Sequence, residues 1–365
     1  MKVVADKKFC IFCGEEPVEK TKEHVLPKWL IKMTGDSGRK GDFGYDFSNL
    51  PTKRIYEYNA FTFPACKLCN SNFGEYVEAP AEIIIGKILE HKSISIIDAD
   101  NLLDWLDKIR IGLWLGFRQL NKNWNHIVPH YFISSRLSEK DRLLIAYEIK
   151  DQNPGLGYIG VHTLAFTCVP ACYGIRINNL ILINASSDHL FSYNLGFPYP
   201  QSITPIPGES SKYNLNITNG KENLNYPLIN GLQTDSLEIY QPIIPAYARN
   251  ENSKTLYDTE YVKARLSDKN SGKGSLFIKT ENCDLKQWIL DDKYPLLTFK
   301  IYNKDFIMSK IYQQILFIQN YVLKNRPSII DADPDMNKQY NEKYEEAIKQ
   351  NETLSHRISE LMRLS

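Results

Sequence analysis

Two Cys-x-x-Cys pairs lie in the first eighty residues of the chain, at positions 10–13 and 66–69. Each such pair forms a tight turn that brings two sulfurs to one ion, so that four thiolates in two pairs match the tetrahedral ligand set of a structural zinc site. Disulfides are the alternative, but no signal peptide is recognisable, and thiols stay reduced in the cytoplasm. We therefore expect a cytoplasmic protein in which zinc is bound by Cys10, Cys13, Cys66 and Cys69.

A segment with the sequence Glu-His-Val-Leu-Pro lies between the two pairs, at positions 23–27. Its two aliphatic residues favour an extended chain, which Pro27 ends. The order of CxxC, EHVLP and then CxxCN at the start of a helix resembles the HNH endonucleases of the ββα-metal type, in the subgroup with a four-cysteine zinc site. The resemblance covers about residues 8–80. The chain is also similar to bacterial HNH-like proteins in which EH-x-x-P-x-W-L precedes CxxCN, an aromatic residue and a glutamate, here Phe73 and Glu78.

The resemblance implies a nuclease centre in which His24 is the general base, because a neutral imidazole with a pKa of about 6.5 accepts a proton from water at pH 7. Negative charge then builds on the phosphate and on the leaving oxygen. A hard divalent cation with oxygen ligands, Mg²⁺ or Mn²⁺, stabilises that charge. By the same resemblance Glu23 and Asn70 are the ligands of this ion. The family often has histidine at the second place, and an amide oxygen is a weaker, neutral ligand.

The group that holds the imidazole of the base has several candidates. By strict spacing the position belongs to Phe61, whereas Asn59 takes it if the strand is bulged and Asn49 is a weaker candidate. A backbone carbonyl can do the same work. Glu78 follows Asn70 by eight positions on an expected helix, where it orients the metal ligand or binds a second ion. The alternative for Glu78 is a solvated carboxylate.

The net charge of the chain is +1, so that no overall basic field indicates a nucleic-acid partner. Attraction to DNA depends on the local placement of cations instead. An insertion at residues 31–58 is rich in glycine and is expected to be a mobile loop that closes on a backbone. RNA stays an alternative to DNA. The side chains expected to contact phosphates are Lys28, Lys32, Arg39, Lys40, Lys53 and Arg54.

The fold class expected for the whole chain is α+β. Residues 1–95 form a zinc-stabilised, treble-clef-like ββα-metal domain, residues 96–325 a larger mixed α/β domain, and residues 326–365 a linker and an amphipathic helix that packs back or forms a homodimer. Helical spacing predicts two helices in residues 81–121 and one at 306–323. Strands are expected at 127–133, 143–149, 157–168, 173–177 and 180–184, with a turn at 178–179. Three unpaired cysteines, expected to be buried thiols, are Cys168, Cys172 and Cys283.

The function expected from these observations is metal-dependent hydrolysis of DNA phosphodiester bonds. The large second part binds substrate, forms a dimer, or senses a small molecule or phage component, as in bacterial anti-phage effectors that join an HNH domain to a sensor. Two alternatives stay open: a zinc module that binds nucleic acid without cutting it, and a structural or interaction protein. Loss of cleavage on changing His24 separates the enzyme from the first, and failure to bind nucleic acid at low salt favours the second.

Overall fold

The computed structural model describes the chain in ranges separated by gaps. These ranges are residues 9–46, 52–120, 132–138, 140–151, 153–196, 199–207, 213–218, 229, 231–232, 234, 236–243, 273–279, 285–297, 300–329 and 334–364. Within them the fold is mixed α and β with antiparallel sheets, as the sequence predicts. Across the same ranges, no helix combines the length and the apolar character that a membrane crossing requires.

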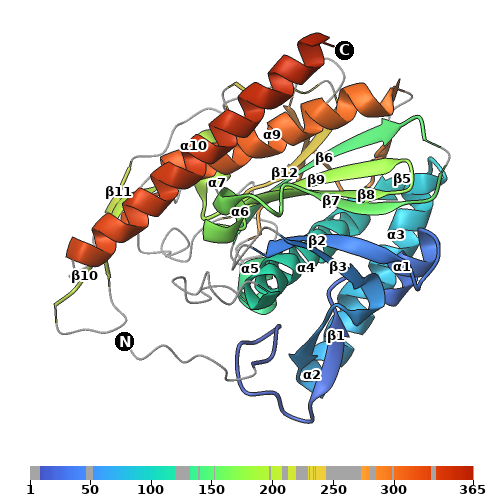
Figure 1. Ribbon diagram of the computed structural model, residues 1–365, viewed down its shortest axis with the longest axis horizontal. Helices are drawn as coiled ribbons and strands as arrows, with labels where there is room; N and C mark the ends of the chain where they lie inside the picture. Colours follow the sequence, from blue (N-terminus) through green and yellow to red (C-terminus); the bar gives the residue numbers. More distant parts are fainter. Residues whose placement is uncertain are drawn as a thin grey trace.

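The N-terminal part contains a two-stranded antiparallel sheet followed by a helix. Its elements are β1 (Thr21–His24), α1 (Lys28–Met33), β4 (Thr62–Ala65) and α2 (Lys67–Phe73). In the β1–β4 pair, Glu23 lies opposite Phe63 and His24 opposite Thr62. Figure 1 shows β1 and α2 next to each other at the lower end of the molecule. Two strands and a helix in this order agree with the expected ββα arrangement, while the HNH assignment itself stays a prediction.

The insertion expected to be a mobile loop is largely a β-hairpin, and that expectation was wrong. Its antiparallel strands are β2 (Lys40–Asp46) and β3 (Thr52–Glu57), followed by a 3₁₀ turn, η1 (Tyr58–Ala60). The glycines here serve close packing and turns. A Cβ on Gly41 would lie 2.6 Å from the Tyr58 ring. Gly35, just after α1, has a φ of +131°, which other residues rarely adopt.

A continuous helical segment leads from the second cysteine pair into the rest of the molecule. Helix α2 passes through a π-helical turn, η2 (Gly74–Glu78), into α3 (Ala79–Leu89), and after β5 (Ser93–Ser95) the chain forms α4 (Ile96–Leu120). Both helices expected in residues 81–121 are therefore confirmed. All residues from 105 to 117 on α4 are buried. A helix that is buried on every side must pack against structure on every side.

An eight-stranded sheet forms the centre of the remaining chain. Its strands are β6 (Asp141–Ile149), β7 (Leu156–Ile159), β8 (Cys172–Ile177), β9 (Leu180–Ser187), β12 (Leu237–Gln241), β13 (Phe277–Lys279), β14 (Leu285–Gln287) and β16 (Ile301–Tyr302). The order is β14-β13-β12-β6-β9-β8-β7, with β16 parallel to β6. The strands expected at 143–149, 173–177 and 180–184 are confirmed. So is the turn between β8 and β9, where Asn178 has a φ of +57°.

Two expected strands differ from the structure. The segment at 157–168 contains the short strand β7 and then a helix, α6 (Leu164–Cys168). This helix begins because the Thr163 hydroxyl accepts a hydrogen bond from the backbone N–H of Phe166, which caps its first turn. The segment at 127–133 lies mostly outside the described residues, and Ile133 begins helix α5 (Ile133–Ser138).

Helices cover both faces of the large sheet (Figure 1). Tyr173 on β8 donates to the backbone oxygen of Leu106 on α4, at 3.1 Å. The next residue, Gly174, faces the other side, where a Cβ would lie 2.9 Å from Ile315. The sheet therefore separates a core on the α4 side from a core on the other side. The helices beyond the second core are α7 (Leu190–Leu195), α9 (Lys304–Asn325) and α10 (Pro334–Leu364).

The C-terminal helix packs back on the body of the molecule, which is one of the two expected outcomes. Ala347 of α10 is buried against Leu323 of α9 and Cys168 of α6. Near it, the side-chain amide of Asn320 on α9 donates to the backbone oxygen of Ile348 at 3.2 Å. Small sheets complete the fold, formed by β10 (Pro200–Pro205), β11 (Tyr213–Ile217) and β17 (Ser328–Ile329), and by β15 (Lys293–Pro295) with β5.

Helix α4 approaches the β1–β4 pair closely because two of its residues have no side chain. A Cβ on Gly112 would lie 2.9 Å from Val25, and a Cβ on Gly116 would lie 2.1 Å from the Phe61 ring. The two glycines are four positions apart and thus share one face of the helix. Residues of α4 and of the N-terminal part belong to one hydrophobic core. The hydrophobic core therefore continues across residue 95, where a boundary between two domains was expected.

We predict that Gly116→Ala lowers the free energy of unfolding by about 1–3 kcal/mol, the usual cost of overpacking a core. Gly86→Ala on α3 is the matched control, because a Cβ there meets nothing within 4 Å. Alanine has a higher helix propensity than glycine, so that Gly86→Ala should raise the free energy of unfolding by about 0.5–1 kcal/mol. Urea unfolding measures both. A Gly116→Ala protein as stable as the wild type would contradict the close contact between α4 and Phe61.

Candidate functional site

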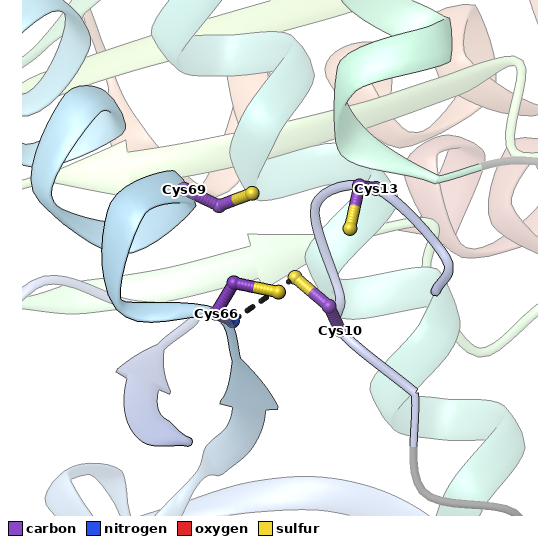
Figure 2. A group of neighbouring side chains, drawn as sticks. All are labelled: Cys10, Cys13, Cys66 and Cys69. Carbon is purple, nitrogen blue, oxygen red and sulfur yellow. Dashed lines mark hydrogen bonds between the residues drawn. The ribbon is translucent and has the colours of Figure 1, made fainter. Parts of the chain in front are cut away.

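The four cysteines of the two CxxC pairs come together (Figure 2). Their Sγ atoms all lie within 4.8 Å of one another. Around a tetrahedral zinc ion with Zn–S bonds of about 2.3 Å, the sulfurs would be about 3.8 Å apart, so that the cluster is close to the size that zinc requires. Within the described ranges it is the one group of three or more His, Cys, Asp or Glu side chains close enough to share an ion. The cluster can hold a metal ion such as zinc.

Backbone groups support this cluster. The N–H of Cys66 donates to Cys10 Sγ and the N–H of Val18 donates to Cys66 Sγ, both at 3.3 Å. Such bonds stabilise negative charge on sulfur, which metal binding requires. Gly14, next to the first pair, has a φ of +83° and closes the turn. The Phe12 ring stacks on the Phe73 ring of α2, with ring centroids 4.3 Å apart. This contact links the turn of the first cysteine pair to the helix that follows the second pair.

Two of the three other cysteines are buried thiols, as expected. Cys168 is 4% exposed and Cys172 fully buried. Burial raises the pKa of the Cys168 thiol to about 11 and raises that of Cys172 further. Both thiols are therefore neutral at pH 7. Cys283 lies outside the described residues.

His24 occupies the last position of β1 and is partly buried. Burial lowers the pKa of its imidazole, and the positive charges of Lys28 and Lys108 lower it further. The ring is therefore held in the neutral form at pH 7. The backbone of Asn59, in the 3₁₀ turn before β4, lies close enough to the ring to oppose this lowering of the pKa.

The Glu23 carboxylate lies in a buried ion cluster that the sequence did not predict. Lys108 of α4 is fully buried, and its Nζ lies 2.5 Å from Glu23 Oε1 and 2.5 Å from Glu78 Oε1. Burial lowers the pKa of the Lys108 ammonium, but the two carboxylates outweigh it and the pKa is raised. Glu78, for which a solvated position was one alternative, is thus bound to an internal cation. The available signal for this contact was a lysine between the apolar residues Leu106 and Ile109 of α4.

Asn70 lies on α2 beside the start of β1. Its side-chain amide donates to Thr21 Oγ1 at 3.0 Å and to the backbone oxygen of Lys22 at 3.4 Å. These bonds use the amide nitrogen, which orients the side chain and leaves the carbonyl oxygen as the atom suited to bind a cation. Asn70 and Glu78 both belong to the continuous α2–η2 segment. Asn70 lies at the beginning of β1, and Glu78 lies near the end of β1.

The cations expected to contact phosphate have different surroundings. Lys28 and Lys32 on α1 and Lys40 at the start of β2 are exposed. The guanidinium of Arg39 instead donates hydrogen bonds at the C-terminal end of α1. Its Nη1 lies 3.0 Å from the backbone oxygen of Ile31, and its Nη2 lies 2.6 Å from Thr34 Oγ1. The side chains of Lys53 and Arg54 lie outside the description, as does the whole of Asn49.

Comparisons with known proteins do not assign this chain to a family. No protein-family model, no curated protein and no solved structure matches the chain.

We predict that the purified protein binds one zinc ion per chain and that Cys10→Ser or Cys66→Ser abolishes this binding, because each change removes one of four thiolates. Cys168→Ser is the control and should retain the metal, since its thiol lies in a separate core. Elemental analysis gives the zinc content and thermal unfolding gives the stability. Zinc retained at full occupancy by Cys66→Ser would contradict the four-cysteine site.

Proposed function

We propose that the chain is a metal-dependent endonuclease of the HNH type that hydrolyses phosphodiester bonds of DNA. The observation that carries this proposal is the partly buried imidazole of His24 at the end of β1, whose pKa is lowered by burial, in a fold that also brings the four cysteines together. A neutral imidazole is the form that a general base requires. The zinc would be structural in this reading, since all four of its ligands come from the protein.

His24 would take the proton from the water that attacks the scissile phosphate. A hydrogen bond from one ring nitrogen to the nearby backbone of Asn59 would leave the other nitrogen available to accept that proton. Burial and the nearby lysines keep the imidazole unprotonated at pH 7. The carboxylate of Glu78 would favour the positive charge that His24 gains in this step.

Glu23 and Asn70 would hold the catalytic divalent ion. A carboxylate and a neutral amide oxygen form a donor set that suits Mg²⁺ or Mn²⁺, which retain several water molecules when bound to protein. One ammonium between two carboxylates also leaves a net charge of −1 when Glu23 and Glu78 are both ionised, which attracts a cation. Such an ion stabilises the negative charge that develops on the phosphate.

The exposed lysines of α1 are the side chains best suited to contact a DNA backbone. Lys28 lies close enough to His24 for its charge to lower the pKa of the imidazole, and Lys32 follows one helical turn later. Phosphate contacts of this kind fix the register of a duplex without reading its sequence. The role of the large sheet, a homodimer and an activator of small-molecule or phage origin stay predictions.

We predict that the zinc-loaded protein nicks supercoiled plasmid with Mg²⁺ or Mn²⁺, and that His24→Ala lowers the rate by about 10²–10⁴-fold, the usual contribution of a general base. EDTA should stop the reaction. His356→Ala is the matched control, because that histidine lies on α10 with 75% of its side chain exposed.

Agarose gels and zinc analysis on the same preparations measure both effects. Equal nicking by the wild type and by His24→Ala at equal zinc content would exclude this histidine as the base. Binding without cutting by either protein would favour a nucleic-acid-binding module instead.

We also predict that Lys28→Ala weakens binding to a short DNA duplex and reduces the slope of log K against log salt by about 0.9, the value for one lost phosphate contact. Lys338→Ala is the control, since this lysine is 75% exposed on α10. Fluorescence anisotropy in a salt series gives both slopes. An unchanged slope for Lys28→Ala would remove this lysine from the DNA interface.

A further inference from the structure

Lys108 contacts the candidate site at four oxygen atoms. Its Nζ lies 2.5 Å from Glu23 Oε1, 2.5 Å from Glu78 Oε1 and 2.8 Å from the backbone oxygen of His24. A fourth contact, at 3.2 Å, is with the backbone oxygen of Val25. The three N–H donors of the ammonium are used by hydrogen bonds to Glu78 Oε1 and to the backbone oxygens of His24 and Val25, while Glu23 is held as an ion pair. The Lys108 side chain thus restrains the backbone of His24, the next peptide at Val25, and the Glu23 carboxylate, which is the expected metal ligand.

A buried ammonium is costly unless it is fully paired, because it loses its hydration. Here two carboxylates and two carbonyls replace the water. Charge-assisted hydrogen bonds of this kind are shorter and stronger than neutral ones, and they also fix direction. The Glu78 carboxylate is held by such a bond, and the ion pair with Lys108 couples the position of Glu23 to helix α4, which follows it by more than seventy residues in the sequence.

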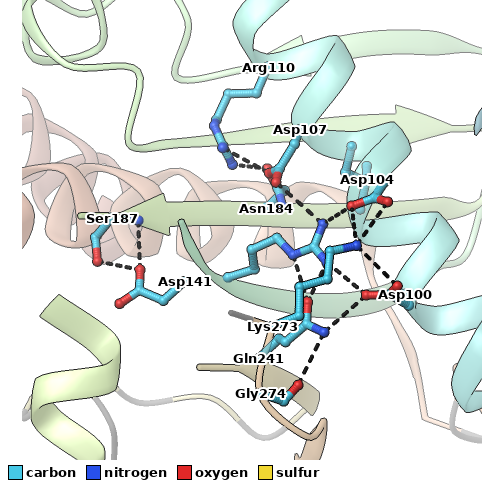
Figure 3. A network of polar contacts seen from close by, with 12 residues as sticks. Asp100, Asp104, Asp107, Arg110, Asp141, Asn184, Ser187, Gln241, Lys273 and Gly274 are labelled. Atoms are coloured by element: carbon cyan, nitrogen blue, oxygen red, sulfur yellow. Dashed lines mark hydrogen bonds and ion pairs between the residues drawn. The ribbon is translucent and has the colours of Figure 1, made fainter. Parts of the chain in front are cut away.

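The part of α4 that precedes Lys108 is fixed to the large sheet by a second charged network (Figure 3). Arg142 of β6 contacts Asp100 Oδ1 at 2.8 Å and also pairs with Asp104. Lys273 contacts both of these aspartates at 3.2 Å. Asp104 lies one helical turn before Lys108, so that the helix is held to strand β6 next to this lysine. A lysine that projects from so restrained a helix has little freedom of its own.

We propose that Lys108 is a positioning residue of the nuclease centre, which holds the Glu23 carboxylate and the backbone at His24 in the arrangement that binds the divalent ion. The inference rests on the proposed function, because it assigns a role within that same centre. Lys108 acts through Glu23 and through the backbone, and it takes no part in proton transfer. Partners that orient a metal ligand typically change metal affinity or activity by about 10–100-fold when they are removed.

The test compares Lys108→Met with Lys279→Met in zinc-loaded protein. Lys279 is the matched control, because it is also a buried lysine, 2.9 Å from the Glu238 carboxylate, but it lies on β13 of the large sheet. Both variants lose a buried ion pair and should lose stability. Circular dichroism identifies a temperature at which all the proteins are folded, and zinc analysis confirms an intact cluster.

Two readouts are then made: Mn²⁺ binding by electron paramagnetic resonance, and the rate of plasmid nicking as a function of Mn²⁺ concentration. We expect Lys108→Met to weaken Mn²⁺ binding by about 10–100-fold and to slow nicking at low Mn²⁺. Lys279→Met should change neither by more than about twofold, because its neighbours are not metal ligands. If Lys108→Met is not folded, Lys108→Gln replaces it, since its amide still bonds the carbonyls, and the same weakening is expected.

Equal Mn²⁺ binding by the Lys108 and Lys279 variants would overturn the inference. Tighter binding by the Lys108 variant would also overturn it, because the ammonium would then compete with the ion. A wild-type protein that binds Mn²⁺ without nicking would contradict the proposed nuclease, while the binding data still decide the role of Lys108. Nicking by a wild type that binds no Mn²⁺ would reject the role of Lys108 and leave the base, tested by His24→Ala, intact.

Discussion

The close contact between helix α4 and strands β1 and β4 is the packing on which the candidate site depends. Gly112 and Gly116 leave room for Val25 and for the Phe61 ring, so that the helix axis lies near the strands. Only at this short separation can the Lys108 side chain reach the Glu23 carboxylate while fully buried. The apolar contact and the charged contact therefore support each other: the first excludes water, and the second compensates the charge that is then buried.

Local patterns in the sequence predicted those parts of the molecule that depend on neighbouring residues. The CxxC spacing located the cluster because each tight turn is fixed by four residues. The EHVLP segment was expected to be extended as far as Pro27, whereas β1 ends at His24. Alternating and continuous apolar runs located the strands β6, β8 and β9 for the same reason.

The contacts that the sequence did not predict join distant segments. Lys108 follows His24 by 84 positions in the sequence, and no local pattern connects the two residues. The glycines of residues 31–58 were interpreted through their freedom, whereas Gly41 is there because the Tyr58 ring leaves no space for a side chain. Arg39 was counted as a surface cation, although its guanidinium is used by the end of helix α1. In each case tertiary packing decided what composition left undetermined.

The π-helical turn at Gly74–Glu78 has a consequence for how this segment tolerates changes in chain length. Such a turn holds one residue more than an α-helical turn. Loss of one residue within it would leave ordinary α-helix, with the Asn70 side and the α3 side both still facing β1 and α4. Loss of one residue inside α3 would instead rotate everything beyond it by about 100°. Natural length variants of this segment should therefore concentrate in the π turn, where an evolving chain can lose a residue without turning α3 away from α4.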